Sequence, residues 1–251
     1  MRSRFSRAAA TYDEASDVQR AAVDRLASLW PPAEGVRRIL ELGCGTGLLT
    51  ELLLHRFPRA RVVAVDFSLP MLTRARARAR VGDGRVDFVC ADGEEFVAGS
   101  RHSFDLVTSN AALQWFADPE KTLERLPRLI SGGGRLVFSC FGPGTLTELD
   151  QALAATTGRS IAAAGFTGFA AMERWLRSSF ARVEGEIVNY RRHHADVRAL
   201  LRSLRDTGTA VPVRGGRPLT PGRLRALDHW FRAHAGGCRV TYEVFFFRCS
   251  P

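Results

Sequence analysis

Lysine is almost absent from this chain. Lys121 is the single lysine beside 35 arginines, and with 26 acidic residues the formal net charge is +10. A nucleic-acid-binding protein gathers its basic residues in a stripe or a tail, whereas these arginines are spread through nearly every segment. The spread leaves two interpretations open: a genome that prefers arginine codons, or long-range attraction of an acidic macromolecular partner.

Closely spaced cysteine pairs and long apolar runs are also missing, and we expect no secretory leader. The cysteines form no CxxC pair, which argues against a disulfide framework and a zinc site. No apolar run approaches the roughly 20 residues of a membrane span, and the first 16 residues contain no apolar signal region. We therefore expect a cytoplasmic protein. The cysteines are Cys44, Cys90, Cys140, Cys238 and Cys249.

Several motifs of well-known enzyme classes are absent. The chain has no GxxxxGK[ST] phosphate loop, no HExxH metal motif and no GxSxG nucleophile turn. His193 and His194 are adjacent but have no third ligand nearby in the sequence, so we interpret them as a surface pair. We expect no metal.

Residues 37–142 alternate between strand and helix patterns. Apolar runs that end in a glycine, an acid or an asparagine alternate with helical spacing of apolar residues. This predicts βαβ units and a parallel sheet, whose ligand lies beyond the carboxyl ends of the strands. The predicted strands are 37–43, 61–67, 85–92, 104–110 and 135–142, and the predicted helices are 16–30, 46–57, 70–80 and 118–130.

After residue 142 the pattern changes to helices with two late strands. Helices are predicted over 145–158, 169–180, 195–208 and 224–234, and strands over 181–191 and 238–249. We therefore expect an α/β fold with a mostly parallel seven-stranded sheet, helices on both faces and a helical lid. The expected parts of this single domain are an N-terminal cap at 1–36, a cofactor-binding core at 37–142, lid and substrate elements at 143–236, and a final strand at 237–251.

A glycine-rich loop follows the first predicted strand and opens the next helix. Glycines let the backbone turn sharply and let a ligand approach without a Cβ in the way. The GxGxG spacing differs from the GxGxxG fingerprint of dinucleotide-binding proteins. The loop reads Glu41-Leu42-Gly43-Cys44-Gly45-Thr46-Gly47.

The ExGxGxG pattern between a strand and a helix resembles motif I of class I S-adenosylmethionine-dependent methyltransferases, and implies their Rossmann-like fold. The resemblance continues at the later strand ends. Asp66 follows Gly43 by 23 residues, where a carboxylate can accept both ribose hydroxyls. The resemblance implies adenine contacts from Asp92 and methionine contacts from Asn110. The implied cofactor-binding residues are Glu41, Gly43, Gly45, Gly47, Asp66, Phe67, Met71, Asp92, Gly93, Asn110 and Gln114.

Segments outside this core resemble the biotin-pathway malonyl-[acyl-carrier-protein] O-methyltransferase family, over about residues 4–248. The most discriminating are FGPGTLTEL at 141–149 and RSLRDTG at 202–208, and AAATYD at 8–13 agrees with them. Glu243 departs from the pattern, because a histidine is expected after Tyr242. We therefore assign no role to Glu243.

The resemblance implies methyl transfer from S-adenosylmethionine to the free carboxylate of a malonyl thioester, giving a methyl ester that enters pimeloyl and biotin synthesis. A carboxylate, with a pKa of about 4, is already anionic at pH 7, so positioning rather than a general base supplies most of the catalysis. An arginine fork suits a carboxylate, and we expect Arg202 or Arg205 in that role. Tyr12 is expected to close over the site.

The implied partner is malonyl-acyl carrier protein, a small acidic protein, or malonyl-coenzyme A. A basic rim around the pocket would steer an acidic carrier. We expect a monomer that binds neither nucleic acid nor membrane. The alternatives are a small-molecule carboxylic-acid methyltransferase, an RNA-modifying methyltransferase and a catalytically silent binding module. The expected rim residues are Arg214, Arg217, Arg223 and Arg225 of the 214–225 loop.

Overall fold

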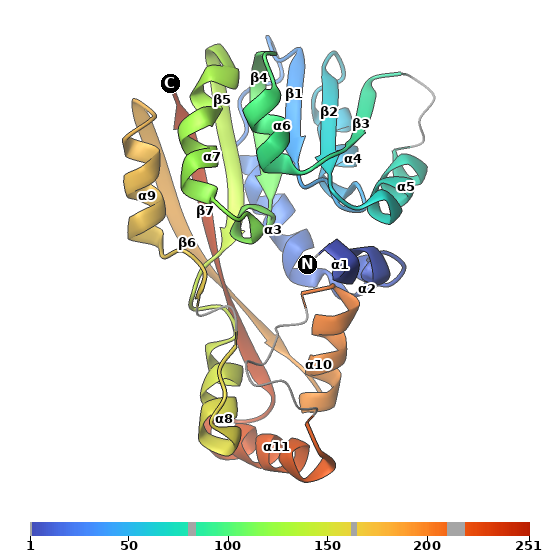
Figure 1. Cartoon of the computed structure of the whole chain (residues 1–251), viewed down its shortest axis with the longest axis vertical. Coiled ribbons are helices and arrows are strands. Elements are labelled where there is room, and N and C mark those ends of the chain that lie inside the picture. Colours follow the sequence, from blue (N-terminus) through green and yellow to red (C-terminus); the bar gives the residue numbers. More distant parts are fainter. Residues whose placement is uncertain (1, 80–83, 162–164, 210–218) are drawn as a thin grey trace.

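The computed structural model describes residues 2–79, 84–161, 165–209 and 219–251. Within these residues, seven strands form one sheet in the order β3-β2-β1-β4-β5-β7-β6 (Figure 1). Strands β1 to β5 run parallel, and β7 is antiparallel to both of its neighbours. The predicted mostly parallel sheet is confirmed. The strands are β1 (Arg38–Leu42), β2 (Arg61–Asp66), β3 (Val86–Cys90), β4 (Phe104–Asn110), β5 (Ile130–Phe141), β6 (Arg182–His193) and β7 (Arg239–Ser250).

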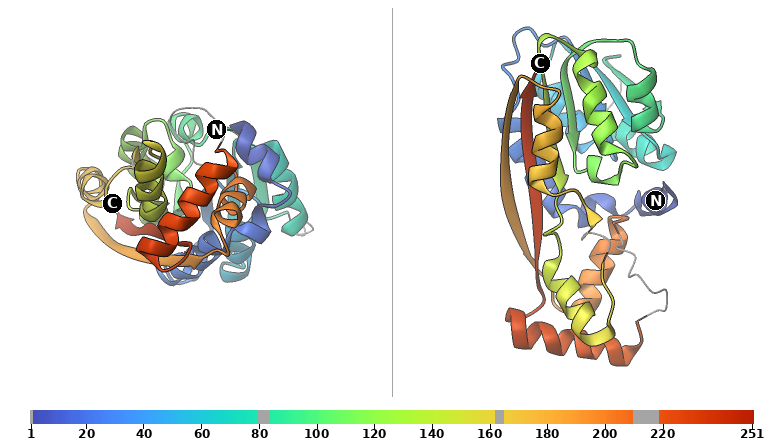
Figure 2. Two further views of the ribbon diagram at one scale, coloured as in Figure 1. Left: turned by 90° about the horizontal axis from the view of Figure 1, so that it is seen from below. Right: turned by 60° about the vertical axis from the view of Figure 1, so that its left-hand side comes forward.

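Helices cover both faces of the sheet (Figures 1 and 2). On one face α3, α4 and α5 bury Leu26, Leu53 and Leu72 against the strands, and on the other face α6, α7 and α9 bury Val97 and Leu123. Because both faces are covered, the central strands are apolar almost throughout. These helices are α3 (Asp17–Ser28), α4 (Leu48–Arg56), α5 (Leu69–Arg78), α6 (Gly93–Gly99), α7 (Pro119–Arg125) and α9 (Phe169–Arg177).

The start of β5 differs from the prediction of a helix over 118–130 that stops at three glycines. The structure has α7, then a 3-10 turn (Leu126–Leu129), and β5 already begins at Ile130. The pairing with β4 jumps from Phe104–Ile130 to Leu106–Arg135, so the glycines between them form a bulge. A Cβ at Gly134 would lie 3.0 Å from two backbone carbonyl oxygens. Glycine therefore permits this close approach.

A lower lobe extends below the sheet in Figure 1. The 12-residue strands β6 and β7 continue past their neighbours and carry three helices on their lower ends. Leu149, Leu200, Leu204, Leu227 and Phe231 are buried together there, in an apolar core separate from those on the sheet faces. The helices are α8 (Thr147–Thr157), α10 (Val197–Asp206) and α11 (Pro221–Ala235).

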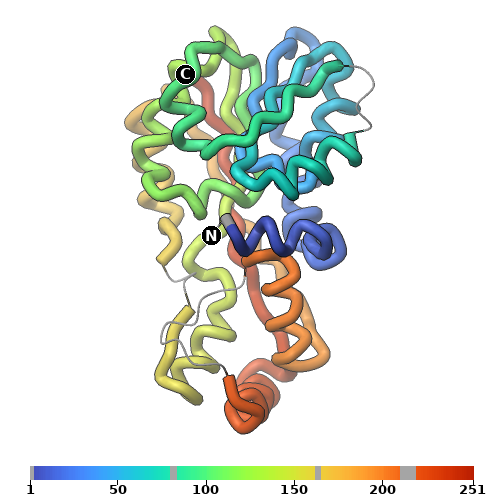
Figure 3. The backbone as a smooth tube through the Cα atoms, turned by 45° about the vertical axis from the view of Figure 1, so that its right-hand side comes forward, coloured from blue at the N-terminus to red at the C-terminus, as the bar shows by residue number. Residues whose placement is uncertain are grey.

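The N-terminal segment, residues 2–15, lies between the sheet and the lower lobe (Figures 1 and 3). It contains two short helices that the sequence does not predict, α1 (Arg2–Ala8) and α2 (Tyr12–Ala15). It crosses below the carboxyl ends of the parallel strands, which is where the ligand of such a sheet is expected. No helix in the described part of the chain is long and apolar enough to cross a membrane.

Candidate active site

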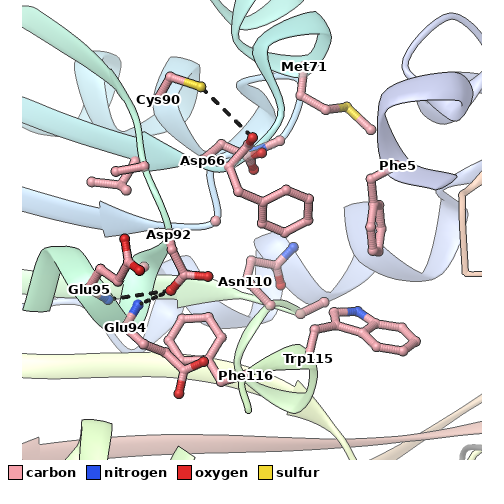
Figure 4. Close-up of a pocket in the computed structure, with 18 of the residues that line it drawn as sticks. Phe5, Asp66, Met71, Cys90, Asp92, Glu94, Glu95, Asn110, Trp115 and Phe116 are labelled. Atoms are coloured by element: carbon pink, nitrogen blue, oxygen red, sulfur yellow. Dashed lines mark hydrogen bonds between the residues drawn. The ribbon is translucent and has the colours of Figure 1, made fainter. Parts of the chain in front are cut away.

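A cavity of about 620 Å³, here called the main cavity, opens at the carboxyl ends of β1 to β4. Figure 4 shows Met71, Phe5 and Trp115 along one side of it, and Asp92, Glu94 and Glu95 with Phe116 along the other. Its lining includes nine residues that the sequence singled out: Tyr12, Gly43, Gly45, Asp66, Phe67, Met71, Asp92, Gly93 and Asn110. The lining does not include Glu41, Gly47, Gln114, Arg202 or Arg205.

The three glycines of the loop after β1 have distinct tasks. All three have positive φ, +71° at Gly43, +54° at Gly45 and +84° at Gly47, a region that favours glycine. A Cβ on Gly43 would lie 2.3 Å from the Ala112 side chain, and one on Gly47 would lie 2.9 Å from the Ala75 backbone. A Cβ on Gly45 would meet no protein atom within 4 Å. Gly45 therefore leaves room for a ligand, whereas Gly47 lets α4 approach α5.

Asp66 holds the glycine loop and faces the main cavity. One carboxylate oxygen accepts the Gly45 N–H at 2.9 Å, and the other accepts the Ser68 N–H at 2.8 Å. Burial raises the pKa of Asp66, and these two hydrogen bonds oppose the shift. Each oxygen keeps a second lone pair. The carboxylate can therefore shape the loop and still accept a ribose hydroxyl.

The charged residues that line the main cavity are all acidic. Asp66, Asp92, Glu94 and Glu95 line it, and no arginine, lysine or histidine of the described residues does. One oxygen of Asp92 caps α6 by accepting the Glu94 N–H at 2.8 Å, and the other accepts no hydrogen bond from the described residues. An acid-only lining favours a ligand with net positive charge. S-adenosylmethionine fits, since it carries a sulfonium and an ammonium group against one carboxylate.

Aromatic side chains from three segments close one side of the main cavity. The Phe5 ring of α1 lies 5.9 Å from the Phe67 ring and 5.8 Å from the Trp115 ring, edge-on to both. Met71 of α5 is buried beside them and lines the same cavity. This wall suits a flat base. The sequence carries no periodic signal that would have placed Phe5 here.

Tyr12 brings a hydroxyl from the N-terminal segment to the main cavity. Burial, and then the nearby Asp66 and Asp13 carboxylates, raise the pKa of Tyr12 well above its usual value of 10. The phenol therefore stays protonated at physiological pH. Its oxygen forms no hydrogen bond with any described residue, which leaves it able to donate to a ligand.

Asp13, which the sequence analysis did not single out, ties the N-terminal segment to the glycine loop. Its carboxylate accepts hydrogen bonds from the Thr46 hydroxyl and from the Arg78 guanidinium, both at 2.5 Å. Thr46 stands between two loop glycines and Arg78 ends α5. This Asp13 contact therefore joins the segment that carries Tyr12 to the wall behind the ligand.

Asn110 ties the end of β4 to α3 and β5, and Gln114 supports the turn that follows β4. The Asn110 amide donates to the Gln19 carbonyl at 3.1 Å and accepts from the Ser139 hydroxyl at 2.6 Å. Gln114 donates to the Ala111 carbonyl at 2.7 Å and lines a separate cavity of about 240 Å³. The structure thus places Gln114 beside the main cavity rather than in its lining, and it supports a turn in which Ala111 has a φ of +52°.

Glu41 lies behind the glycine loop, buried at 1% exposure. One of its oxygens accepts the Thr50 hydroxyl of α4 at 2.6 Å, and the other has no partner among the described residues. Burial raises the pKa of Glu41 to about 8. Its position fits a role in joining β1 to α4 rather than in direct ligand contact.

The two arginines expected at the substrate carboxylate lie outside the main cavity. Arg202 lines a second cavity of about 400 Å³ between the N-terminal segment and the lower lobe, together with Arg192. Glu14, Asp17 and Asp206 line it too, so its charges largely offset one another. Arg205 lines neither cavity. Both side chains are exposed on α10.

The expected basic rim is described only in part. Arg214 and Arg217 lie outside the described residues. Arg223 and Arg225 belong to α11, at the far end of the lower lobe (Figure 1). Neither lines a cavity described above. Neither of the two described arginines of this loop therefore lies at the mouth of the main cavity.

Glu243 fastens the loop that follows β5. Its carboxylate accepts the Gly144 N–H at 3.0 Å, and its backbone carbonyl accepts the Thr145 hydroxyl at 3.0 Å. A Cβ on Gly142 would lie 2.1 Å from the same carboxylate. The glutamate and the small residues of the FGPGT segment are therefore matched in size. This gives the unexpected residue a structural task.

The described residues contain no group of three or more His, Cys, Asp or Glu side chains that could hold a metal ion. The five cysteines are free, and Cys90 is the exposed one. His193 is exposed, whereas His194 is half-buried in the lining of the second cavity. Burial there, and then the neighbouring His193, lower the pKa of His194. The histidine pair is thus only partly on the surface.

Known proteins resemble this chain in sequence and in fold. Residues 40–138 match the family model described as a methyltransferase domain. The chain is 33% identical over 254 residues to the malonyl-[acyl-carrier protein] O-methyltransferase of Anoxybacillus flavithermus, covering 98% of this chain and 95% of that protein. It is also 33% identical to the protein of that name from Brevibacillus brevis, with 98% and 94% covered.

Among solved structures, the YcgJ protein of Bacillus subtilis superposes with a TM-score of 0.62 at 14% identity, covering 91% of this chain and 97% of that one. This likeness confirms the fold, and the full-length relatives above identify the family. The chain therefore belongs to the malonyl-[acyl-carrier protein] O-methyltransferase family of S-adenosylmethionine-dependent methyltransferases.

Proposed function

We propose that this enzyme transfers the methyl group of S-adenosylmethionine to the free carboxylate of malonyl-acyl carrier protein, yielding the methyl ester that enters pimeloyl and biotin synthesis. The observation that carries the proposal is the acid-only main cavity at the carboxyl ends of the strands, in a chain that its relatives match from end to end. The cationic methyl donor complements such a site, and the anionic acceptor is attracted to the sulfonium of the bound donor.

The cofactor is proposed to lie along the glycine loop. Gly43 and Gly45 give it backbone access, Asp66 accepts the ribose hydroxyls, and Asp92 with Gly93 faces the adenine. Met71 and Phe67 flank the base, and Asn110 lies by the methionine part. When bound, S-adenosylmethionine supplies a methyl group activated by its sulfonium. The main cavity lining supports these roles.

The chain's own residues position the acceptor and exclude water. A carboxylate is deprotonated at pH 7, so the enzyme needs no general base and no metal to activate it. Tyr12, with its raised pKa, can donate a hydrogen bond to a carboxylate oxygen and stay protonated throughout. Phe5 and Trp115 close the aromatic side over the reacting groups. We assign no carboxylate contact to Arg202 or Arg205, which lie outside the main cavity.

The proposal is tested with labelled S-adenosylmethionine and three carrier-bound thioesters: malonyl, acetyl and succinyl. We expect label on the malonyl substrate and none on the acetyl substrate, which lacks a free carboxylate. Equal labelling of all three, or no labelling of malonyl, would refute the proposal. Malonyl-coenzyme A, tested beside the carrier, shows which thioester the enzyme prefers.

The same assay separates the alternative functions. A small-molecule carboxylic-acid methyltransferase would label free malonate without a carrier. An RNA-modifying enzyme would label RNA with an affinity that falls steeply with salt. A silent binding module would bind the cofactor and label nothing. We propose that the enzyme acts in the cytoplasm as a monomer.

A further inference from the structure

One face of α10 is basic and forms no ion pair with the described residues. Arg198, Arg202 and Arg205 stand at positions i, i+4 and i+7 of this helix, so they form one stripe. All three side chains are exposed. The opposite face buries Leu200 and Leu204 in the core of the lower lobe. The helix is therefore anchored on one side and presents three cations on the other, here called the α10 stripe.

The α10 stripe has no acidic partner within the described residues. None of its guanidinium groups lies within 4 Å of a described carboxylate, although other arginines of the chain do pair, such as Arg25 with Glu186 at 2.6 Å and Arg78 with Asp13. Like charges at this spacing destabilise a helix slightly. The cost is offset when an outside partner supplies the missing negative charge.

The stripe leads to the wall of the main cavity. At the carboxyl end of α10, the Thr11 hydroxyl donates to the Asp206 carbonyl at 3.0 Å. A Cβ on Gly208 would lie 3.1 Å from the Phe5 backbone, and Phe5 lines the main cavity. Figure 3 shows α10 directly below the N-terminal segment. A partner bound to the α10 stripe would therefore lie beside the N-terminal segment, which forms part of the wall of the main cavity.

The surroundings favour docking over a clamp for a single carboxylate. The arginines are solvent-exposed, where one ion pair contributes little, and Arg202 shares its cavity with three acids. A row of charges about 10 Å long, from seven helical steps, instead attracts an extended acidic surface over a distance. The row carries no exposed aromatic residue on which nucleic-acid bases could stack.

We infer that the α10 stripe is the docking surface for an acidic acyl carrier protein. The inference rests on the proposed function, because it supplies the carrier that this surface receives. The carrier's acidic face lies along the three arginines, and its flexible thioester arm enters past the N-terminal segment. The arginines recognise the carrier and not the malonyl group.

The test replaces Arg198, Arg202 and Arg205 together with glutamine. The matched control replaces Arg56, Arg59 and Arg61, which are also exposed and lie at the opposite end of the sheet. Both triple variants lose three positive charges. Each is assayed with malonyl-acyl carrier protein and with malonyl-pantetheine, which has no protein to dock. Circular dichroism and S-adenosylmethionine binding verify that both variants are folded.

We expect the stripe variant to raise the KM for malonyl-acyl carrier protein by about tenfold or more with kcat unchanged, while its kcat/KM for malonyl-pantetheine stays within about twofold of the unmodified enzyme. The control should behave like the unmodified enzyme. Salt should lower kcat/KM for the carrier substrate in the unmodified enzyme and have a much weaker effect in the stripe variant.

Three outcomes would overturn the inference. Equal losses on both substrates would place the arginines at the malonyl group, and no loss on either would show that the stripe does not dock the carrier. A loss of RNA affinity without a change toward the carrier would assign another partner. If the unmodified enzyme methylates no malonyl thioester, the proposed function fails, and calorimetric binding of malonyl-acyl carrier protein to the two triple variants then tests docking alone.

Discussion

Asp66 performs two tasks with one carboxylate. Its oxygens hold the Gly45 and Ser68 N–H groups, and the same oxygens face the main cavity. The loop conformation and the ligand site are thus coupled through a single side chain. A substitution at this position should weaken cofactor binding by more than the accompanying loss of folding stability explains.

Asp66→Ala is expected to weaken S-adenosylmethionine binding by about tenfold or more, because hydrogen bonds to a charged group are lost. Isothermal titration calorimetry measures the affinity. Asp105→Ala is the matched control, since Asp105 also accepts two backbone N–H groups, from Arg37 and Arg38 at 2.8 and 2.9 Å, away from the main cavity. Both variants should lose stability. Unchanged affinity in Asp66→Ala would contradict the assigned role.

Glu41 makes stability depend on pH. Burial raises its pKa from 4.5 to about 8, so between these values the unfolded chain is ionised at this position while the folded chain is protonated. The unfolded state then binds fewer protons, and the free energy of unfolding falls as pH rises. Its contribution is complete below about pH 4.5 and is lost as pH rises through about 8.

Glu41→Gln should flatten this pH dependence, because glutamine cannot ionise and its amide oxygen can still accept the Thr50 hydroxyl. Urea unfolding between pH 5 and pH 9 measures the effect. The unmodified protein should lose stability across this range more steeply than the variant. Parallel curves for the two proteins would show that Glu41 is ionised in the fold.

At the scale of elements, the N-terminal segment decides how the main cavity is closed. It contributes Phe5 and Tyr12 to the lining. The Asp13 contact attaches it to both the glycine loop and α5. Because the segment forms part of the cavity wall, its movement changes the access of a ligand to the main cavity. The Asp13 contact should therefore limit the movement of the N-terminal segment over the main cavity.

Asp13→Ala is expected to increase hydrogen exchange in residues 3–15 and to raise the KM for S-adenosylmethionine several-fold, because a charge-assisted attachment is removed. Glu186→Ala is the control, since it breaks the similarly short Arg25 ion pair between α3 and β6, away from the main cavity. Unchanged exchange in Asp13→Ala would show that the segment is held by its apolar contacts.

Elements with strong local patterns were predictable, and those that depend on neighbours were not. The strands ending at Leu42 and Asp66 are apolar runs with clear stops, and the structure has them nearly as predicted. α6 has only seven residues, counting the glycine at each end, which is too few for helical periodicity to show. The bulge before Arg135 depends on pairing with β4, which no local pattern encodes.

At the scale of the whole molecule, the net charge of +10 has no single explanation. Some arginines form ion pairs within the chain: Arg25 pairs with Glu186, and Arg78 pairs with Asp13. The main cavity excludes basic residues from its described lining, and the α10 stripe concentrates three of them on one exposed helix face. Composition therefore describes the total charge, whereas the fold separates an acidic interior site from a basic exterior face.

The sequence by itself determined the α/β alternation, the glycine loop and the strand-end residues Asp66, Asp92 and Asn110, because these depend on spacing along a few consecutive residues. Only the tertiary structure decided which distant segments meet. It brought Phe5 and Tyr12 into the lining of the main cavity, joined Asp13 to the loop after β1, and placed Arg202 and Arg205 on an exposed face. The physical reason is that chain direction and long-range packing, which local spacing does not specify, set where a side chain points.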